Sequence, residues 1–72
     1  RAEQFLYDHG FRQFRVRVHG DIARIEVSPT ERSKFFDEKF MDLVANEFKK
    51  IGFVYTALDL QGYRTGSMNE VL

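Results

Sequence analysis

The sequence contains no cysteine and no tryptophan among its 72 residues. Without cysteine, the chain has no disulfide, no thiolate metal site and no cysteine nucleophile. Its formal net charge is zero, with eleven basic and eleven acidic residues, which argues against a general nucleic-acid or membrane surface. No apolar run approaches the roughly 20 residues that a bilayer-spanning helix requires, and no secretory signal is present. We therefore expect a soluble, cytoplasmic protein with neither nucleic acid nor membrane as partner.

The length allows one small domain with a thin core. Domains of this size bury only roughly 60% of their unfolded surface. Eight phenylalanines and three tyrosines offset this limit, because large aromatic side chains bury the most area per residue. The first residue is Arg1 rather than methionine, and it already lies in a helical pattern. We interpret residues 1–72 as a single accessory domain excised from a longer chain.

The clearest local pattern is a β-hairpin over residues 14–27. Apolar and polar residues alternate on both sides of Gly20-Asp21, and a glycine-first loop of two residues suits a hairpin turn. Folding about this loop creates an apolar face that pairs Val18 with Ala23, Val16 with Ile25, and Phe14 with Val27. The other face sets Arg15 opposite Glu26, and Arg17 opposite Arg24. A slip of one residue would place arginines in the core, so this register is the expected one.

The remaining elements follow from helical and strand periodicity. A helix before Gly10 is followed by a strand from Phe11 to Val18 and a second strand from Ile22 to Ser28. Ser28-Pro29-Thr30-Glu31 resembles a capping box and predicts a helix from about Pro29 to Ile51, with a break allowed near residues 33–35. A third strand is expected from Phe53 to Leu60, and residues 61–69 form a looped tail.

This order predicts an α+β fold, a small αββαβ sandwich akin to a truncated ferredoxin-like fold. The sheet is three-stranded and mixed, with both helices on one face and the first strand in the centre. The expected core consists of Val16, Val18, Ala23, Ile25, Phe40, Val44, Phe48 and Leu58. The other face is left bare and carries Arg15, Arg17, Arg24, Glu26, Tyr55 and Asp59. We call this surface the open face.

Motifs for catalysis are missing from the sequence. Gly62 and Gly66 are not followed by the lysine and hydroxyl of a phosphate-binding P-loop. His9 and His19 make no metal signature, and the place of His9 near a helix end is explained by the helix dipole. The sequence also lacks a recognisable nucleophile elbow, the turn that presents the serine of a serine–histidine triad. We expect no catalytic and no metal-binding residue in this chain.

The arginines of the hairpin form a candidate anion site. Arg15 and Arg17 project from one strand about 7 Å apart, with Arg24 directly across. Guanidinium groups grip phosphate or carboxylate with two hydrogen bonds each. Glu26 and Asp59 are expected as supporting polar residues on the same face. Two alternatives stay open, namely a solvated charged face and a subunit or interdomain interface.

Two blocks of the sequence resemble the C-terminal domain of the LarE-type proteins, which are sulfur transferases of the PP-loop ATP-pyrophosphatase superfamily. The blocks are Gly10 to Arg17 continued by His19 to Val27, and Leu58 to Asn69. The resemblance covers nearly the whole chain, whereas residues 29–50 are generic.

The resemblance implies a two-part enzyme. An N-terminal PP-loop domain uses ATP and Mg²⁺ to adenylate a carboxylate of a pyridinium mononucleotide, and a cysteine then gives up its sulfur. This chemistry serves the nickel-pincer cofactor of lactate racemase. Neither the ATP-binding loop nor that cysteine lies in these 72 residues. In the family the C-terminal part supports oligomerisation and completes the site near the substrate's phosphate, a role that Arg15 and Arg17 fit.

Two hypotheses result from these observations. In the first, the chain is an accessory domain whose Arg15 and Arg17 hold the phosphate of a mononucleotide substrate, beside its own N-terminal domain and in a homo-oligomer. In the second, it is a structural oligomerisation module without a ligand, and the arginines pair with carboxylates of a neighbouring subunit.

Overall fold

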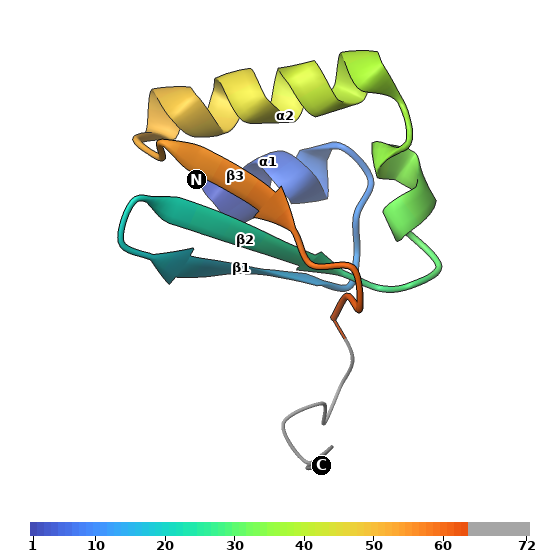
Figure 1. Cartoon of the computed structure of the whole chain (residues 1–72). Helices are drawn as coiled ribbons and strands as arrows, with labels where there is room; N and C mark the ends of the chain where they lie inside the picture. The colour runs from blue at the N-terminus through green and yellow to red at the C-terminus, as the bar shows by residue number, and fades with distance from the viewer. Residues whose placement is uncertain (64–72) are drawn as a thin grey trace, which may run out of the picture.

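The computed structural model describes residues 1–63, which form a three-stranded sheet with two helices on one side (Figure 1). In chain order the elements are α1 (Ala2–Asp8), β1 (Phe14–His19), β2 (Ile22–Val27), the 3-10 helix η1 (Arg32–Phe35), α2 (Glu38–Ile51) and β3 (Tyr55–Leu58). The α+β fold expected from the sequence is confirmed. Residues 64–69 of the expected looped tail, and of the second family-like block, lie outside the described residues.

The hairpin has the predicted register. Arg15 lies opposite Glu26, and Arg17 lies opposite Arg24, in an antiparallel pair of β1 with β2. Gly20 has a φ of 59°, while no other residue type has a positive φ in residues 1–63. A positive φ at the first loop position alone is what a glycine-first hairpin turn requires. The alternation of side chains therefore determined both the turn and the face of every strand residue.

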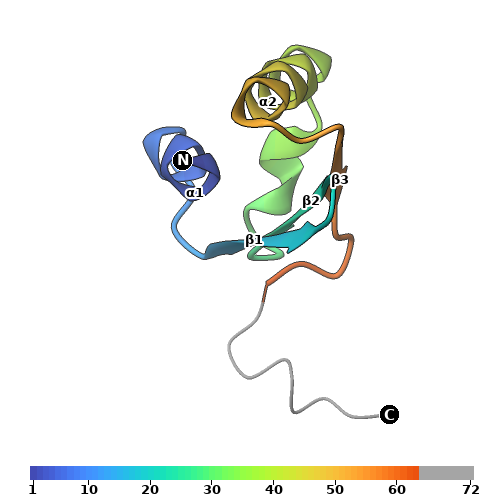
Figure 2. The same cartoon turned by 90° about the vertical axis from the view of Figure 1, so that its left-hand side faces the viewer.

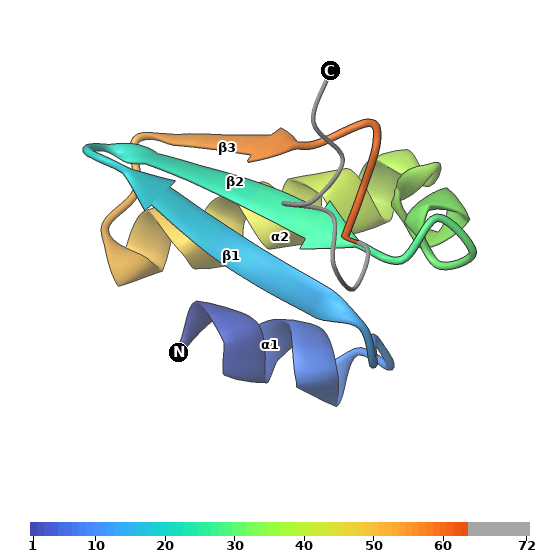
Figure 3. The same ribbon diagram turned by 90° about the horizontal axis from the view of Figure 1, so that it is seen from below.

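The strand order differs from the expected one. The sheet runs β1-β2-β3, so β2 is central, and β3 lies parallel to β2 rather than beside β1 (Figure 3). The expectation of a central first strand was wrong. The β1 edge is engaged by α1, where the carboxylate of Glu3 accepts a hydrogen bond from the backbone N–H of Val16 at 3.2 Å. Because α1 occupies the outer edge of β1, β3 pairs with the remaining edge of β2.

Both helices cover the same face of the sheet, as expected (Figure 2). α1 packs against β1 and α2 against β3, and the rings of Phe5 and Phe48 meet edge-to-face at 6.0 Å between the helices. The buried core consists of Leu6, Phe11, Ala23, Ile25, Val27, Phe35, Val44 and Phe48. Of the predicted core residues, four are buried and three (Val16, Phe40 and Leu58) pack half-buried against them.

Val18 was wrongly placed in the core, because it is 61% exposed. It belongs to the correct face of β1, but it lies next to the hairpin turn at Gly20. Periodicity tells which way a strand residue faces, and it does not tell how far the covering helices extend.

The segment between β2 and α2 is not the helical start that was predicted. Residues 28–31 form a turn, η1 follows, and α2 begins only after Asp37, whose side chain accepts a hydrogen bond from the N–H of Lys39. Glu31 does not complete a capping box, because its carboxylate accepts hydrogen bonds from the N–H groups of Arg12 and Gln13 at the entry to β1. This long-range contact outweighs the local capping pattern. As a result Phe35 is buried, whereas Phe36 is 71% exposed.

Candidate anion-binding site

The predicted site residues come together on the open face of the sheet. β1 carries Arg15 and Arg17, and the central strand β2 carries Arg24 and Glu26. Asp59 follows β3, and its backbone N–H donates to the carbonyl of Ile25 at 2.8 Å, which extends the pairing of the two strands. All five side chains thus gather on one surface, as the register implied.

Glu26 joins two of the arginines. Its Oε2 lies 2.7 Å from Nη1 of Arg24, and its Oε1 lies 3.4 Å from Nε of Arg17. The side chain of Glu26 is only 11% exposed, so this carboxylate lies beneath the guanidinium groups. The like-charge contact of Arg17 with Arg24 is therefore offset by a shared carboxylate. Glu26 does not pair with Arg15, the residue directly opposite in the register.

Asp59 completes the ion pairs of Arg24, with Oδ2 at 2.5 Å from Nη1. Burial alone would raise the pKa of Asp59, but hydrogen bonds to Oδ1 from the backbone N–H groups of Gln61 and Gly62, together with that of Arg24, outweigh it and lower the pKa. The carboxylate is thus ionised at neutral pH. Arg24 is held between two carboxylates, and its Nη1 is committed to both.

The chain after Asp59 crosses the open face near the end of β2 (Figures 1 and 3). The N–H of Tyr63 donates to the carbonyl of Val27 at 2.7 Å, and Nη1 of Arg32 donates to the carbonyl of Leu60 at 2.6 Å. The Arg15 guanidinium lies over the ring of Tyr63, 5.9 Å from its centroid. The open face is therefore partly covered at this end, not bare throughout as predicted.

Sequence reasoning missed Tyr63 and Arg32 as members of this surface. Residues 61–63 were assigned to a loop without further contacts. One signal was present, since an aspartate side chain often accepts a hydrogen bond from the backbone two residues later in a turn, as Asp59 does from the N–H of Gln61. No local pattern could reveal that the turn leads back across β2.

Arg15 and Arg17 keep free hydrogen-bond donors. Within residues 1–63, Arg17 uses only Nε, and Arg15 makes no hydrogen bond through its guanidinium. The Arg17 side chain is 44% exposed. The three hairpin arginines, Arg15, Arg17 and Arg24, exceed the carboxylates of Glu26 and Asp59 by one positive charge. The arrangement can therefore accept an anion from the solvent side.

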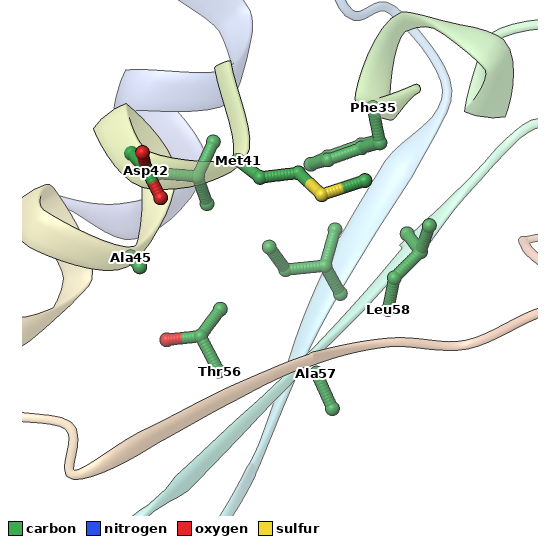
Figure 4. A pocket seen from close by; sticks show the side chains of 9 residues that line it. Phe35, Met41, Asp42, Ala45, Thr56, Ala57 and Leu58 are labelled. Carbon is green, nitrogen blue, oxygen red and sulfur yellow. The ribbon is translucent and has the colours of Figure 1, made fainter. Parts of the chain in front are cut away.

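A pocket of about 360 Å³ lies on the other side of the sheet, between α2, η1 and β3 (Figure 4). Its walls include the apolar side chains of Phe35, Met41 and Leu58, and Asp42 is the one ionisable residue among 1–63 that lines it. No cationic side chain from the described part of the chain lines it, so these walls do not suit a phosphate-bearing ligand. The open face is the stronger candidate for anion binding.

Comparison with known proteins identifies relatives of the chain. No family model matches it. Over 71 residues, 99% of its length, it is 44% identical to the pyridinium-3,5-bisthiocarboxylic acid mononucleotide synthase of Lactiplantibacillus plantarum. Over 72 residues it is 39% identical to the uncharacterized protein slr1717 of Synechocystis sp.. The resemblance to the LarE-type proteins is confirmed.

The chain spans about a quarter of the length of these relatives, 25% and 27% respectively. A LarE-type relative thus has a much larger part that this chain does not contain. Within residues 1–63, no three His, Asp or Glu side chains are grouped so as to hold a metal ion. Among the same residues, no helix has both the length and the apolar character to cross a membrane.

Proposed function

We propose that the chain is the C-terminal accessory domain of an ATP-dependent, AMP-forming sulfur transferase that acts on a pyridinium mononucleotide in nickel-pincer cofactor biosynthesis. In this role Arg15 and Arg17 bind the substrate's phosphate, and the domain supports a homo-oligomer. Two findings support the proposal. A relative of similar sequence is a pyridinium-3,5-bisthiocarboxylic acid mononucleotide synthase, and Arg15 and Arg17 project from the open face with guanidinium donors that no residue among 1–63 occupies fully.

The observation that supports this proposal most directly is that Arg24 is neutralised by carboxylates, whereas Arg15 and Arg17 keep donors for a ligand. Arg24 is neutralised by Glu26 and Asp59, so it serves to position the Glu26 carboxylate. Glu26 in turn contacts Nε of Arg17 and leaves the terminal nitrogens of that guanidinium for a ligand. Charge-assisted hydrogen bonds of this kind are worth roughly 1.5–3 kcal/mol each. Arg15 and Arg17 would therefore supply most of the affinity for phosphate.

The remaining steps belong to the part of the parent protein outside this chain. We assign ATP and Mg²⁺ to the N-terminal PP-loop domain, where they would activate the carboxylate for sulfur transfer. The described residues of this chain do not touch the reacting carboxylate in this proposal. They hold the phosphate at the other end of the mononucleotide, which fixes the orientation of the substrate.

The second candidate is a structural module that mediates oligomerisation without a ligand. The observation that favours it is a sheet face on which charges alternate in sign, since Arg15 and Arg17 could pair with carboxylates of another subunit. The two candidates differ in what an arginine substitution changes. Loss of a ligand site alters substrate affinity, whereas loss of an interface alters the oligomeric state.

The test uses the full-length parent with Arg15→Ala and Arg17→Ala. Each variant should raise KM for the pyridinium mononucleotide about tenfold or more, because at least one charge-assisted hydrogen bond is lost. Binding of ATP should stay unchanged, as measured by calorimetry. Lys49→Ala removes the same charge from the exposed side of α2 and serves as the matched control.

Sedimentation of the same variants separates the two candidates. Raised KM in an intact oligomer supports the phosphate site. Unchanged KM contradicts it, and dissociation of the oligomer at unchanged substrate affinity assigns the arginines to an interface instead.

A further inference from the structure

The hydrophobic core is incomplete at one end of the molecule. The start of α1, the end of β1 and the end of α2 lie together there (Figures 1 and 3). Val18 points to the side of the sheet that the helices cover, yet it is 61% exposed. Val16, the next residue of β1 on that side, is only half-buried. The two helices therefore leave apolar surface uncovered at this end.

A hollow of about 290 Å³ lies at this end, and we call it the end groove. Its apolar walls come from β1 and from the end of α2 with the residue after Gly52, namely Val16, Val18, Ile51 and Phe53. Within residues 1–63, its charged lining residues are Arg1 and Glu3, which have opposite signs. Small-molecule sites have roughly 300–1,000 Å³, so this groove is at their lower limit. It suits a side chain of a polypeptide better than a whole ligand.

The first turn of α1 forms one wall of the end groove and is held in place there. The carboxylate of Glu3 accepts a hydrogen bond from the N–H of Val16 at 3.2 Å, which joins this turn to β1. Arg1 itself lines the groove, so a residue joined to its N-terminal side starts at the rim. The groove is therefore within immediate reach of a polypeptide segment that leads into Arg1.

The length of the relatives points to such a segment. This chain spans only 27% and 25% of their lengths, and the proposed function sets a PP-loop domain before Arg1. A segment tethered at the rim has an effective concentration in the millimolar range for a short linker, whereas a second copy must bind from solution. The tethered segment is thus the favoured occupant.

We infer that the end groove docks the segment that joins Arg1 to the N-terminal domain of the parent protein, through an apolar side chain of that segment. The inference rests on the proposed function, of which it uses the domain before Arg1, and it names the surface of contact. Docking removes the apolar surface of Val18 from water, which is the main favourable term in association. Because Val18 follows Arg17 in β1, it also fixes the strand of the phosphate site relative to the N-terminal domain.

The test replaces Val18 by aspartate in the full-length parent. A carboxylate is costly to bury without a partner, so Val18→Asp should undock the segment. Amide hydrogen exchange of the residues just before Arg1, followed by mass spectrometry, should become about tenfold faster or more. Val54→Asp is the matched control, because Val54 is also 61% exposed and does not line the groove. It should leave this exchange unchanged.

Val18→Ala keeps the test decisive if the aspartate prevents folding, which circular dichroism detects. It removes two methyl groups from the groove and should speed the same exchange about threefold. The inference is refuted if the residues before Arg1 exchange in the wild type as fast as an unstructured peptide, or if neither variant changes their rate. Dissociation of the oligomer by Val18→Asp at unchanged exchange also refutes it, and assigns the groove to a second copy.

Substrate binding separates this result from the phosphate site. Arg15→Ala and Arg17→Ala act on the open face and leave the end groove intact. If they do not alter substrate affinity while Val18→Asp undocks the segment, the phosphate site fails and the docking surface stands. If they weaken substrate binding while the Val18 variants leave the exchange unchanged, the phosphate site stands and the docking surface fails.

Discussion

Glu26 illustrates how a single residue acquires its role from the fold. From the register it faces Arg15, and the sequence predicts a pair between the two. In the structure it reaches along its own strand to Arg24 and diagonally to Arg17. Its burial makes this choice favourable, because a nearly buried carboxylate gains more from two guanidinium contacts than from one. Periodicity predicted the face of each residue correctly, but the pairing depends on side-chain reach and on Asp59.

Asp59 should make the stability of the chain depend on acid pH. Its folded-state pKa lies below the ordinary value of 3.8, so its contribution is present above that value and is lost as the pH falls through the folded pKa. Thermal unfolding of the wild type and of Asp59→Asn, followed from pH 6 to pH 2, checks this prediction. The difference in melting temperature should shrink towards pH 2. A difference that stays constant with pH would show that the carboxylate does not act through its charge.

At the scale of elements, local patterns succeeded where neighbours in sequence also pair in space. The register of the hairpin was predicted correctly, since turn and alternation determine it without help from the rest of the chain, but β1 runs from Phe14 to His19 and not from Phe11 to Val18. The segment from Ser28 to Asp37 was not, because Glu31 makes its hydrogen bonds to residues before β1. β3 is also shorter than the predicted strand from Phe53 to Leu60. Val54 and Leu60 flank it as exposed residues that no helix covers.

The turn after β3 depends on glycine at one position. Gly62 has a φ of 84°, and a Cβ atom there would lie 2.3 Å from the carbonyl oxygen of Val27. Gly62→Ala must therefore displace the backbone that pairs Tyr63 with Val27. Gly20→Ala is the control, because its φ of 59° carries the usual strain of about 1–2 kcal/mol while no atom lies within 4 Å.

Chemical denaturation of both glycine variants measures the effect. We expect Gly62→Ala to lower the free energy of unfolding by clearly more than Gly20→Ala, and to weaken phosphate binding as well, since Arg15 rests on Tyr63. Equal losses in the two variants would contradict the close approach of the turn to β2.

For the molecule as a whole, the strand order determines which residues lie next to one another on the open face. With β2 central, the arginines of β1 and the apolar residues of β3 flank one strand and form a single open face. The sequence predicted which residues share this face. It could not predict their lateral order, because that depends on which strand edge α1 engages through Glu3.

The central claim, that Arg15 and Arg17 form an anion site, is tested most directly by titrating the chain with inorganic phosphate. Calorimetry at low and high salt should show saturable binding that weakens as salt increases, because exposed charges are screened. Binding should be lost in Arg15→Ala and Arg17→Ala and retained in Lys49→Ala, which removes the same charge elsewhere. Absence of saturable binding by the wild type, or equal weakening in all three variants, would contradict the account.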